Sequence, residues 1–186
     1  MRAKTIYIAG VPASGKTTLM RRIRKELFGD YTEVRHGSCR AIVSEDGHYV
    51  MLGVFDGSTF EGTDRLSMTV IGDAIPYVSS LRDVVVFAEG DRLANRRFLT
   101  ETQASLIVLD AAPRVLEMRH RARRDNQPEA FLKRCRTKVG NLAAAYGALT
   151  LNNNTSEESE CNFQLITRQA KKWISENSTA SATNPR

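Results

Sequence analysis

Residues 10–17, GVPASGKT, follow a short apolar segment and combine glycines, a lysine and a threonine at a characteristic spacing. Gly10, Gly15, Lys16 and Thr17 fit the pattern G-x-x-x-x-G-K-[ST] of a P-loop, in which glycines let backbone N–H groups wrap around an anion. Lys16 supplies a positive charge to the outer phosphates of a nucleoside triphosphate, and the Thr17 hydroxyl can ligate Mg²⁺. We expect Lys16 to face solvent when no nucleotide is bound. The predicted nucleotide site comprises Gly10, Val11, Pro12, Ala13, Ser14, Gly15, Lys16, Thr17 and Thr18.

A second stretch, residues 54–68, has the composition of an acceptor site for a transferred phosphoryl group. Asp56 follows an apolar segment and precedes Gly57, so its carboxylate is expected at the carboxyl edge of a sheet. Phosphoryl transfer to a hydroxyl benefits from a carboxylate that orients the nucleophile and accepts its proton. Asp56 is the first candidate for this base and Asp64 the second, with Asp56 as a turn residue the alternative. The predicted acceptor contacts are Arg65 for a phosphate, and Phe55 and Phe60 for a flat base, although Phe55 fits the core equally well.

Two acids, Glu89 and Asp91, end the apolar stretch 83–91. Ligands of open α/β sheets bind beyond the carboxyl ends of the strands, where these two side chains are expected. We expect one of them to act on Mg²⁺ through water. The other is expected to cap a helix that begins near Arg92.

The positive charge of the chain is concentrated in residues 114–138. This segment has nine Lys or Arg against three Asp or Glu, a difference of six that equals the net charge of +6 for the whole chain. Such a segment is either a solvated helix face or a surface for phosphates. Arg119 and Arg123 are four residues apart and share a helix face, so we expect them to act on the transferring phosphoryl group as parts of an arginine-rich helical lid.

The order of the elements indicates how these residues are positioned. Alternating strands and helices predict the P-loop NTPase fold, an open, mostly parallel α/β sheet flanked by helices. Residues 1–176 are expected to form one domain, and the polar tail 177–186 to be disordered. The predicted strands lie in 4–10, in 39–55 as two strands around the Asp46-Gly47 turn, and in 83–91, 104–113 and 148–155. The predicted helices are 17–29, 63–74, 113–125, 128–147 and 161–176. Pro76 is expected to end or kink the helix 63–74, with a further turn to Leu81.

The composition narrows the class of protein. No apolar run approaches the length of a membrane span. The three cysteines are odd in number and widely separated, which fits neither a disulfide framework nor a zinc site, so we expect reduced cysteines in a cytoplasmic protein. A regulatory GTPase is disfavoured, because residues 152–155 read Asn-Asn-Asn-Thr where a guanine motif Asn-Lys-x-Asp would be expected.

Four stretches together resemble phage 5-hydroxymethyluracil DNA kinases: the P-loop, FDGSTFEGTDRLSM, FAEGDR, and TKVGNL with NNNT. The resemblance extends over residues 4–175, and the Asp-Gly to Ser-Met stretch is its most discriminating part. It implies ATP at residues 10–17, Mg²⁺ as cofactor, and DNA containing 5-hydroxymethyluracil as acceptor. We expect Asn153 and Thr155, in the last polar loop, to contribute to the nucleotide site.

The sequence therefore predicts a phage-encoded, ATP- and Mg²⁺-dependent kinase of thymidine hypermodification that converts 5-hydroxymethyluracil in DNA to its 5-phosphomethyl form. A base inside a duplex must be flipped out or locally unpaired to be enclosed. Two alternatives remain open: a kinase for a nucleoside, nucleotide or sugar, and a non-catalytic ATP-dependent DNA-binding module. The predicted contacts to the DNA backbone are Lys133, Arg134, Arg136 and Lys138.

Overall fold

The computed structural model describes residues 1–57, 61–125 and 127–182. Its centre is a sheet with the strand order β2-β3-β4-β5-β1-β6-β7. The strands from β4 to β7 in this order pair in parallel, and β2, β3 and β4 pair antiparallel. This arrangement confirms the predicted α/β sheet. The strands are β1 Lys4–Ala9, β2 Tyr31–His36, β3 Cys39–Ser44, β4 Tyr49–Leu52, β5 Val85–Glu89, β6 Ser105–Asp110 and β7 Leu149–Asn152.

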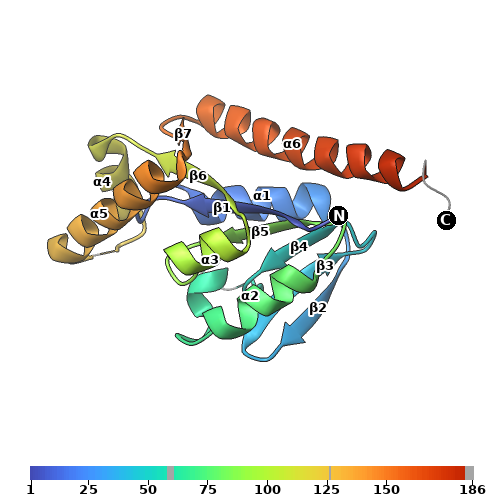
Figure 1. Ribbon diagram of the computed structural model, residues 1–186. Coiled ribbons are helices and arrows are strands. Elements are labelled where there is room, and N and C mark those ends of the chain that lie inside the picture. The colour runs from blue at the N-terminus through green and yellow to red at the C-terminus, as the bar shows by residue number, and fades with distance from the viewer. Residues whose placement is uncertain (58–60, 126, 183–186) are drawn as a thin grey trace.

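Helices cover both faces of the sheet. Figure 1 shows the first and last helices together above the sheet and the second and third below it, with the fourth and fifth beyond β6 and β7. Because both faces are covered, the central strands read as continuous apolar runs rather than as alternating patterns. The helices are α1 Lys16–Leu27, α2 Ile71–Ser80, α3 Arg96–Glu101, α4 Pro113–Ala122, α5 Glu129–Tyr146 and α6 Ser156–Ala182.

Two apolar layers hold the helices to the sheet. Neighbouring residues of β5 point to opposite sides: Val86 packs in the layer under α2, α3 and α5, and Phe87 packs in the layer under α1 and α6. Phe98 of α3 and Ile23 of α1 are fully buried in these layers. Burying a large apolar side chain contributes roughly 1.5–3 kcal/mol, so the layers fix the strand ends that carry the site.

The stretch after residue 62 differs from the predicted helix 63–74. Only a short 3₁₀ turn, Thr63–Arg65, forms there, and α2 begins at Ile71. The Thr63 hydroxyl donates to the carbonyl of Glu89, and the Asp64 side chain accepts from backbone N–H groups after β5. These contacts hold the turn against the sheet edge, so tertiary contacts prevail over local helix propensity.

The helix α2 continues through Pro76 to Ser80, close to the expected end at Leu81, and its apolar side chains stay in the core. Two further features differ from expectation. The strand β2 was not predicted, because it lies at the sheet edge with a largely exposed, polar sequence. The helix α6 begins at Ser156 and extends to Ala182, so residues 177–182 are helical where a disordered tail was expected. Within the described parts of the chain, no helix is long and apolar enough to cross a membrane.

Candidate active site

The P-loop connects β1 to α1 and depends on close backbone approaches. Gly10 has φ 156° and Gly15 has φ 103°, both in the region that favours glycine. A Cβ atom on Gly15 would lie 2.3 Å from Nδ2 of Asn153, and one on Gly10 would lie 2.5 Å from the carbonyl oxygen of Leu109. The two glycines therefore let the loop pack against its supports while its N–H groups stay available for phosphate.

The Lys16 side chain folds back onto the loop, whereas the sequence led us to expect it to face solvent. Its Nζ donates to the carbonyl oxygens of Gly10 at 2.9 Å and Val11 at 3.1 Å. Burial lowers the pKa of Lys16, and the nearby carboxylates of Glu89 and Asp64 act in the opposite direction. These carbonyls satisfy the ammonium group until a phosphate can take their place.

Glu89, at the end of β5, is the buried acid beside the P-loop. Its side chain is 3% exposed, and the Thr17 hydroxyl donates to its Oε1 at 3.3 Å. Burial raises the pKa of Glu89 to about 7, against the opposing effect of Lys16. Among the described residues, there is no cluster of three or more His, Cys, Asp or Glu side chains that could bind a metal ion. Thr17 and Glu89 fit Mg²⁺ that is shared with substrate phosphates, which is how this ion is usually held.

Asp91, the other candidate for the metal, faces α5. It pairs with Lys138, whose Nζ lies 2.6 Å from its Oδ1, and its side chain is 61% exposed. It does not cap a helix either, because α3 begins only at Arg96 and is capped by Asn95, whose Oδ1 accepts from the N–H of Phe98 at 2.9 Å. Of the two acids, Glu89 is therefore the one that contacts the P-loop threonine.

Asp64 is held at the same sheet edge by the turn after β5. Its Oδ1 accepts from the backbone N–H of Asp91 at 2.7 Å and of Arg92 at 3.1 Å. A Cβ on Gly90 would lie 2.7 Å from this oxygen, so glycine is needed for the approach. Both hydrogen bonds go to Oδ1, which leaves Oδ2 available for an acceptor hydroxyl.

The first candidate base, Asp56, lies elsewhere. It forms an ion pair with Arg65, and both side chains are largely exposed. Phe55 is 6% exposed and packs in the core, with the Arg24 guanidinium 5.3 Å from its ring centroid. The structure thus supports the core alternative for Phe55, and Phe60 lies outside the described residues. Of the described acceptor-site candidates in this stretch, only Asp64 lines the cavity with Lys16, whereas Asp56 and Arg65 pair with each other.

One cavity gathers the phosphate-handling groups. It has a volume of about 270 Å³, and Asp64 and Glu89 line it together with Lys16 and Thr17 of the P-loop. An apolar stripe of α5 forms another part of its wall. Sequence reasoning missed this stripe, although its i, i+4, i+8 spacing is visible in the sequence. Its members are Phe131, Cys135 and Val139.

The two predicted lid arginines have different surroundings. Nη1 of Arg119 donates to the carbonyls of Ala13 at 3.3 Å and Ser14 at 3.4 Å, and its Nη2 donates to the carbonyl of Asn153 at 2.7 Å. Burial, with a contribution from nearby Arg123, lowers the pKa of Arg119. Arg123 is exposed and lines the cavity with Lys16. Arg119 therefore holds the P-loop, whereas Arg123 faces the phosphate site.

The polar loop after β7 supports the P-loop from behind. Nδ2 of Asn153 donates to the Ser14 carbonyl at 2.7 Å, and the Asn153 side chain is buried. Thr155 accepts from the N–H of Glu158 at 3.1 Å and so caps the first turn of α6. Asn153 thus supports the P-loop and Thr155 caps α6, and neither residue lines the active-site cavity.

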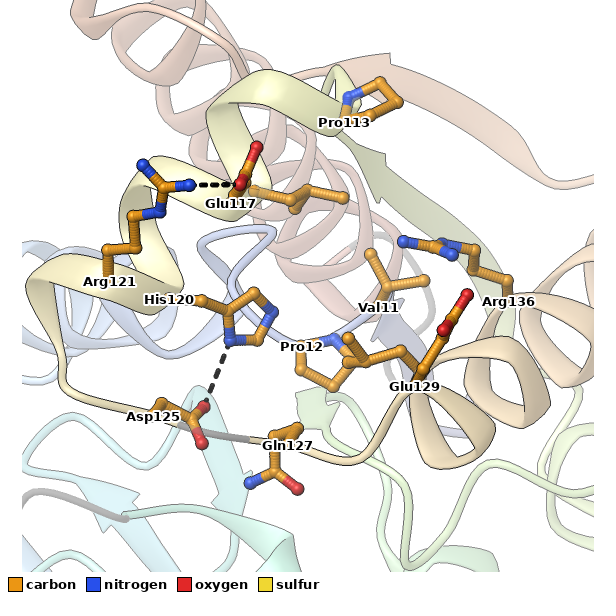
Figure 2. Close-up of a pocket in the computed structure, with 12 residues that line it drawn as sticks. Val11, Pro12, Pro113, Glu117, His120, Arg121, Asp125, Gln127, Glu129 and Arg136 are labelled. Atoms are coloured by element: carbon orange, nitrogen blue, oxygen red, sulfur yellow. Dashed lines mark hydrogen bonds and ion pairs between the residues drawn. The ribbon is translucent and has the colours of Figure 1, made fainter.

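Three of the four cations predicted to contact DNA, Lys133, Arg134 and Lys138, line one groove between α3 and α5. Lys138 also lines the active-site cavity. Arg136 instead lines a cavity of about 550 Å³ between α4 and α5. Figure 2 shows Pro12 near the centre of this second cavity, with Arg136 on one side and, on the other, the contact from His120 to Asp125 at the end of α4.

These features define a P-loop protein that binds a nucleoside triphosphate: a glycine cradle after the central parallel strand, a lysine and a threonine at the start of the next helix, and a buried acid on the neighbouring strand. Residues 1–157 match the family described as P-loop Nucleotide Kinase3, and the chain belongs to this family. It is thus a P-loop kinase.

Two further comparisons were made. A search of curated proteins gives no match. Among solved structures, the shikimate kinase from Bacteroides thetaiotaomicron is similar, with 16% identity over 90% of this chain and 98% of that chain, and a TM-score of 0.47.

Proposed function

We propose that this kinase transfers the γ-phosphoryl group of ATP to the hydroxymethyl group of 5-hydroxymethyluracil in DNA. The observation that carries the proposal is the position of Asp64, which is anchored by two N–H groups at the rim of the cavity that contains Lys16 and Glu89. A carboxylate fixed next to a phosphate cradle is the arrangement that transfer to a hydroxyl requires.

Each residue has a defined part in this reaction. The P-loop N–H groups and Lys16 hold the phosphates, and Thr17 with Glu89 would hold Mg²⁺, which neutralises charge on the phosphate oxygens. The hydroxymethyl oxygen forms a bond to the γ-phosphorus, and the bond from that phosphorus to the bridging oxygen of ADP breaks. The hydroxyl proton passes to Oδ2 of Asp64. Arg123 stabilises the charge that develops on the transferring group.

The apolar part of the cavity supports a flat acceptor. Phe131 and Val139 lie on the α5 stripe that lines the cavity with Asp64. A pyrimidine ring can stack against an aromatic side chain and leave its substituent free to reach the carboxylate. Phe131 thereby takes the role that the sequence suggested for Phe55 and Phe60. A sugar acceptor would instead need polar partners for several hydroxyl groups.

The DNA part of the proposal is supported by the resemblance stated above and by the exposed cations of residues 114–138. The proposal also includes a phage origin and a place in thymidine hypermodification. A phosphomethyl base is activated for later displacement, which fits an intermediate step of such a modification. The main alternative is a small-molecule nucleotide kinase, which the description of the matching family favours. A non-catalytic ATP-dependent DNA-binding module is the second alternative.

An acceptor screen with radiolabelled ATP separates these functions. It compares an oligonucleotide that contains 5-hydroxymethyluracil, the same oligonucleotide with thymine, the free hydroxymethyl nucleoside, and nucleoside monophosphates. We expect label only in the modified oligonucleotide, and its loss with Asp64→Asn. Transfer to the free nucleoside or a monophosphate as efficient as to the oligonucleotide would refute the DNA kinase, and ATP and DNA binding without any transfer would favour the binding module.

A further inference from the structure

A positively charged groove lies between α3 and α5, next to the active-site cavity. It has a volume of about 690 Å³. Arg96 of α3 lines one side, and Lys133, Arg134 and Lys138 of α5 line the other. No acidic side chain is among the described residues that line it. The groove therefore presents cations from two helices to one elongated space.

Hydrogen bonds hold α5 at a fixed spacing from α3 and from the loop before it. The Tyr146 hydroxyl, at the end of α5, donates to the carbonyl of Arg96 at 2.9 Å and lies 2.8 Å from the hydroxyl of Thr100 in α3. Lys138 donates to the carbonyl of Asp91, in the loop before α3, at 3.0 Å. The groove is thus built into the fold and does not need to be opened by a ligand.

The groove is continuous with the active-site cavity. Ala94 and Lys138 line both spaces. Along α5 the groove extends from Ala130 to Leu142, and a rise of twelve residues along the helix is about 18 Å. This length matches about five phosphates of one strand, at about 3.4 Å each along a duplex axis.

We propose that the groove binds the sugar-phosphate backbone of a single nucleic-acid strand next to the acceptor base. The inference rests on the proposed function, because the strand is the one that carries the acceptor into the cavity. A flipped base leaves its own strand close to the protein. Phosphates recognise arrays of cations, and Arg96, Lys133 and Arg134 line the groove beside Lys138, which is paired with Asp91. Asn95, Thr137 and Asn141 add neutral donors along the same path. Arg136 is not part of this groove, because it lines the cavity between α4 and α5.

The test measures binding of a fluorescent, unmodified single-stranded oligonucleotide at several salt concentrations. The groove variant, Arg96→Ala with Lys133→Ala, removes one cation from each wall. The matched control, Arg114→Ala with Arg121→Ala, removes the same charge from exposed positions on α4. We expect the groove variant to bind at least about tenfold more weakly at low salt and to flatten the slope of log affinity against log salt by about 1.4, at about 0.7 per contact on single strands. The control variant should retain both values.

The oligonucleotide-binding test and the acceptor screen give independent results. Equal effects of the two variants, or no effect of either, would overturn the groove even if the enzyme phosphorylates 5-hydroxymethyluracil in DNA. A selective effect of the groove variant would support the groove even if the acceptor screen failed, and would then indicate a different strand-borne acceptor. Unchanged melting temperatures of both variants ensure that the comparison concerns folded protein.

Discussion

Replacing Glu89 with glutamine should change how the stability of the protein depends on pH. The pKa of the buried Glu89 carboxyl is raised to about 7 from an ordinary value of 4.5. At pH values between about 4.5 and 7, the Glu89 carboxyl keeps its proton in the folded protein and loses it in the unfolded chain. The stabilisation associated with this proton is therefore complete below about pH 4.5 and is lost as the pH rises through about 7.

The size of the effect follows from the two pKa values. They differ by about 2.5, and each unit corresponds to about 1.36 kcal/mol, so the ionised carboxylate lowers the free energy of unfolding by about 3 kcal/mol above pH 7. Glutamine cannot ionise and can still accept the hydrogen bond from Thr17. The stability of Glu89→Gln relative to the natural chain should thus increase by about 3 kcal/mol between pH 4.5 and pH 8.

Urea denaturation without nucleotide or Mg²⁺, at half-unit steps from pH 4.5 to pH 8, measures this difference. Glu117→Gln, on the exposed side of α4, gives the baseline for removing a carboxylate. If the curves for the natural chain and Glu89→Gln stay parallel across this range, Glu89 does not change protonation there. The buried acid would then be ionised throughout and compensated by Lys16.

Three further predictions concern transfer. Lys16→Ala should abolish phosphorylation while the circular dichroism spectrum stays unchanged, because the lysine contacts only loop carbonyls; normal turnover would contradict the P-loop assignment. Asp64→Asn should lower kcat by about two to four decades with ATP affinity retained, whereas the kcat of Asp56→Asn should stay within a few-fold of the natural value. If steady-state kinetics show the reverse, Asp56 is the base and Asp64 is not. Arg119→Ala should weaken ATP binding and lower the melting temperature, while Arg123→Ala should lower mainly kcat; equal effects of the two in calorimetry and kinetics would reject this division.

Local patterns predicted where the phosphate-handling segments lie in the fold. Residues 10–17 form the loop between β1 and α1 as expected, and Glu89 ends β5 at the sheet edge. The sequence could not show which acid contacts Thr17. Glu89 and Asp91 are separated only by Gly90, and the directions of their side chains depend on how the backbone turns at that glycine. The sequence did not show that Arg119 would bind loop carbonyls, since that contact requires knowing where β7 and Asn153 lie.

The acceptor side was harder to predict for the same reason. The apolar segment before Asp56 made it the first candidate, whereas Asp64 is distinguished only by the hydrogen bonds from the turn after β5. Those bonds connect residues that are 27 and 28 positions apart and leave no local pattern. The stripe that begins at Phe131 was visible as a periodicity, but a helix stripe indicates burial and not which cavity it faces.

The place of β1 between β5 and β6 has a consequence for synthesis of the chain. The P-loop leaves the ribosome before the strands on either side of it, which begin at Val85 and Ser105, and its support Asn153 comes later still. At roughly 5–20 residues per second, the 143 residues from Gly10 to Asn153 take about 7 to 29 s to synthesise. During that time the glycine-rich segment cannot hold ATP as it does in the finished enzyme. A newly made chain therefore acquires its nucleotide site only after Asn153 has been made, although the P-loop itself was made before its supports.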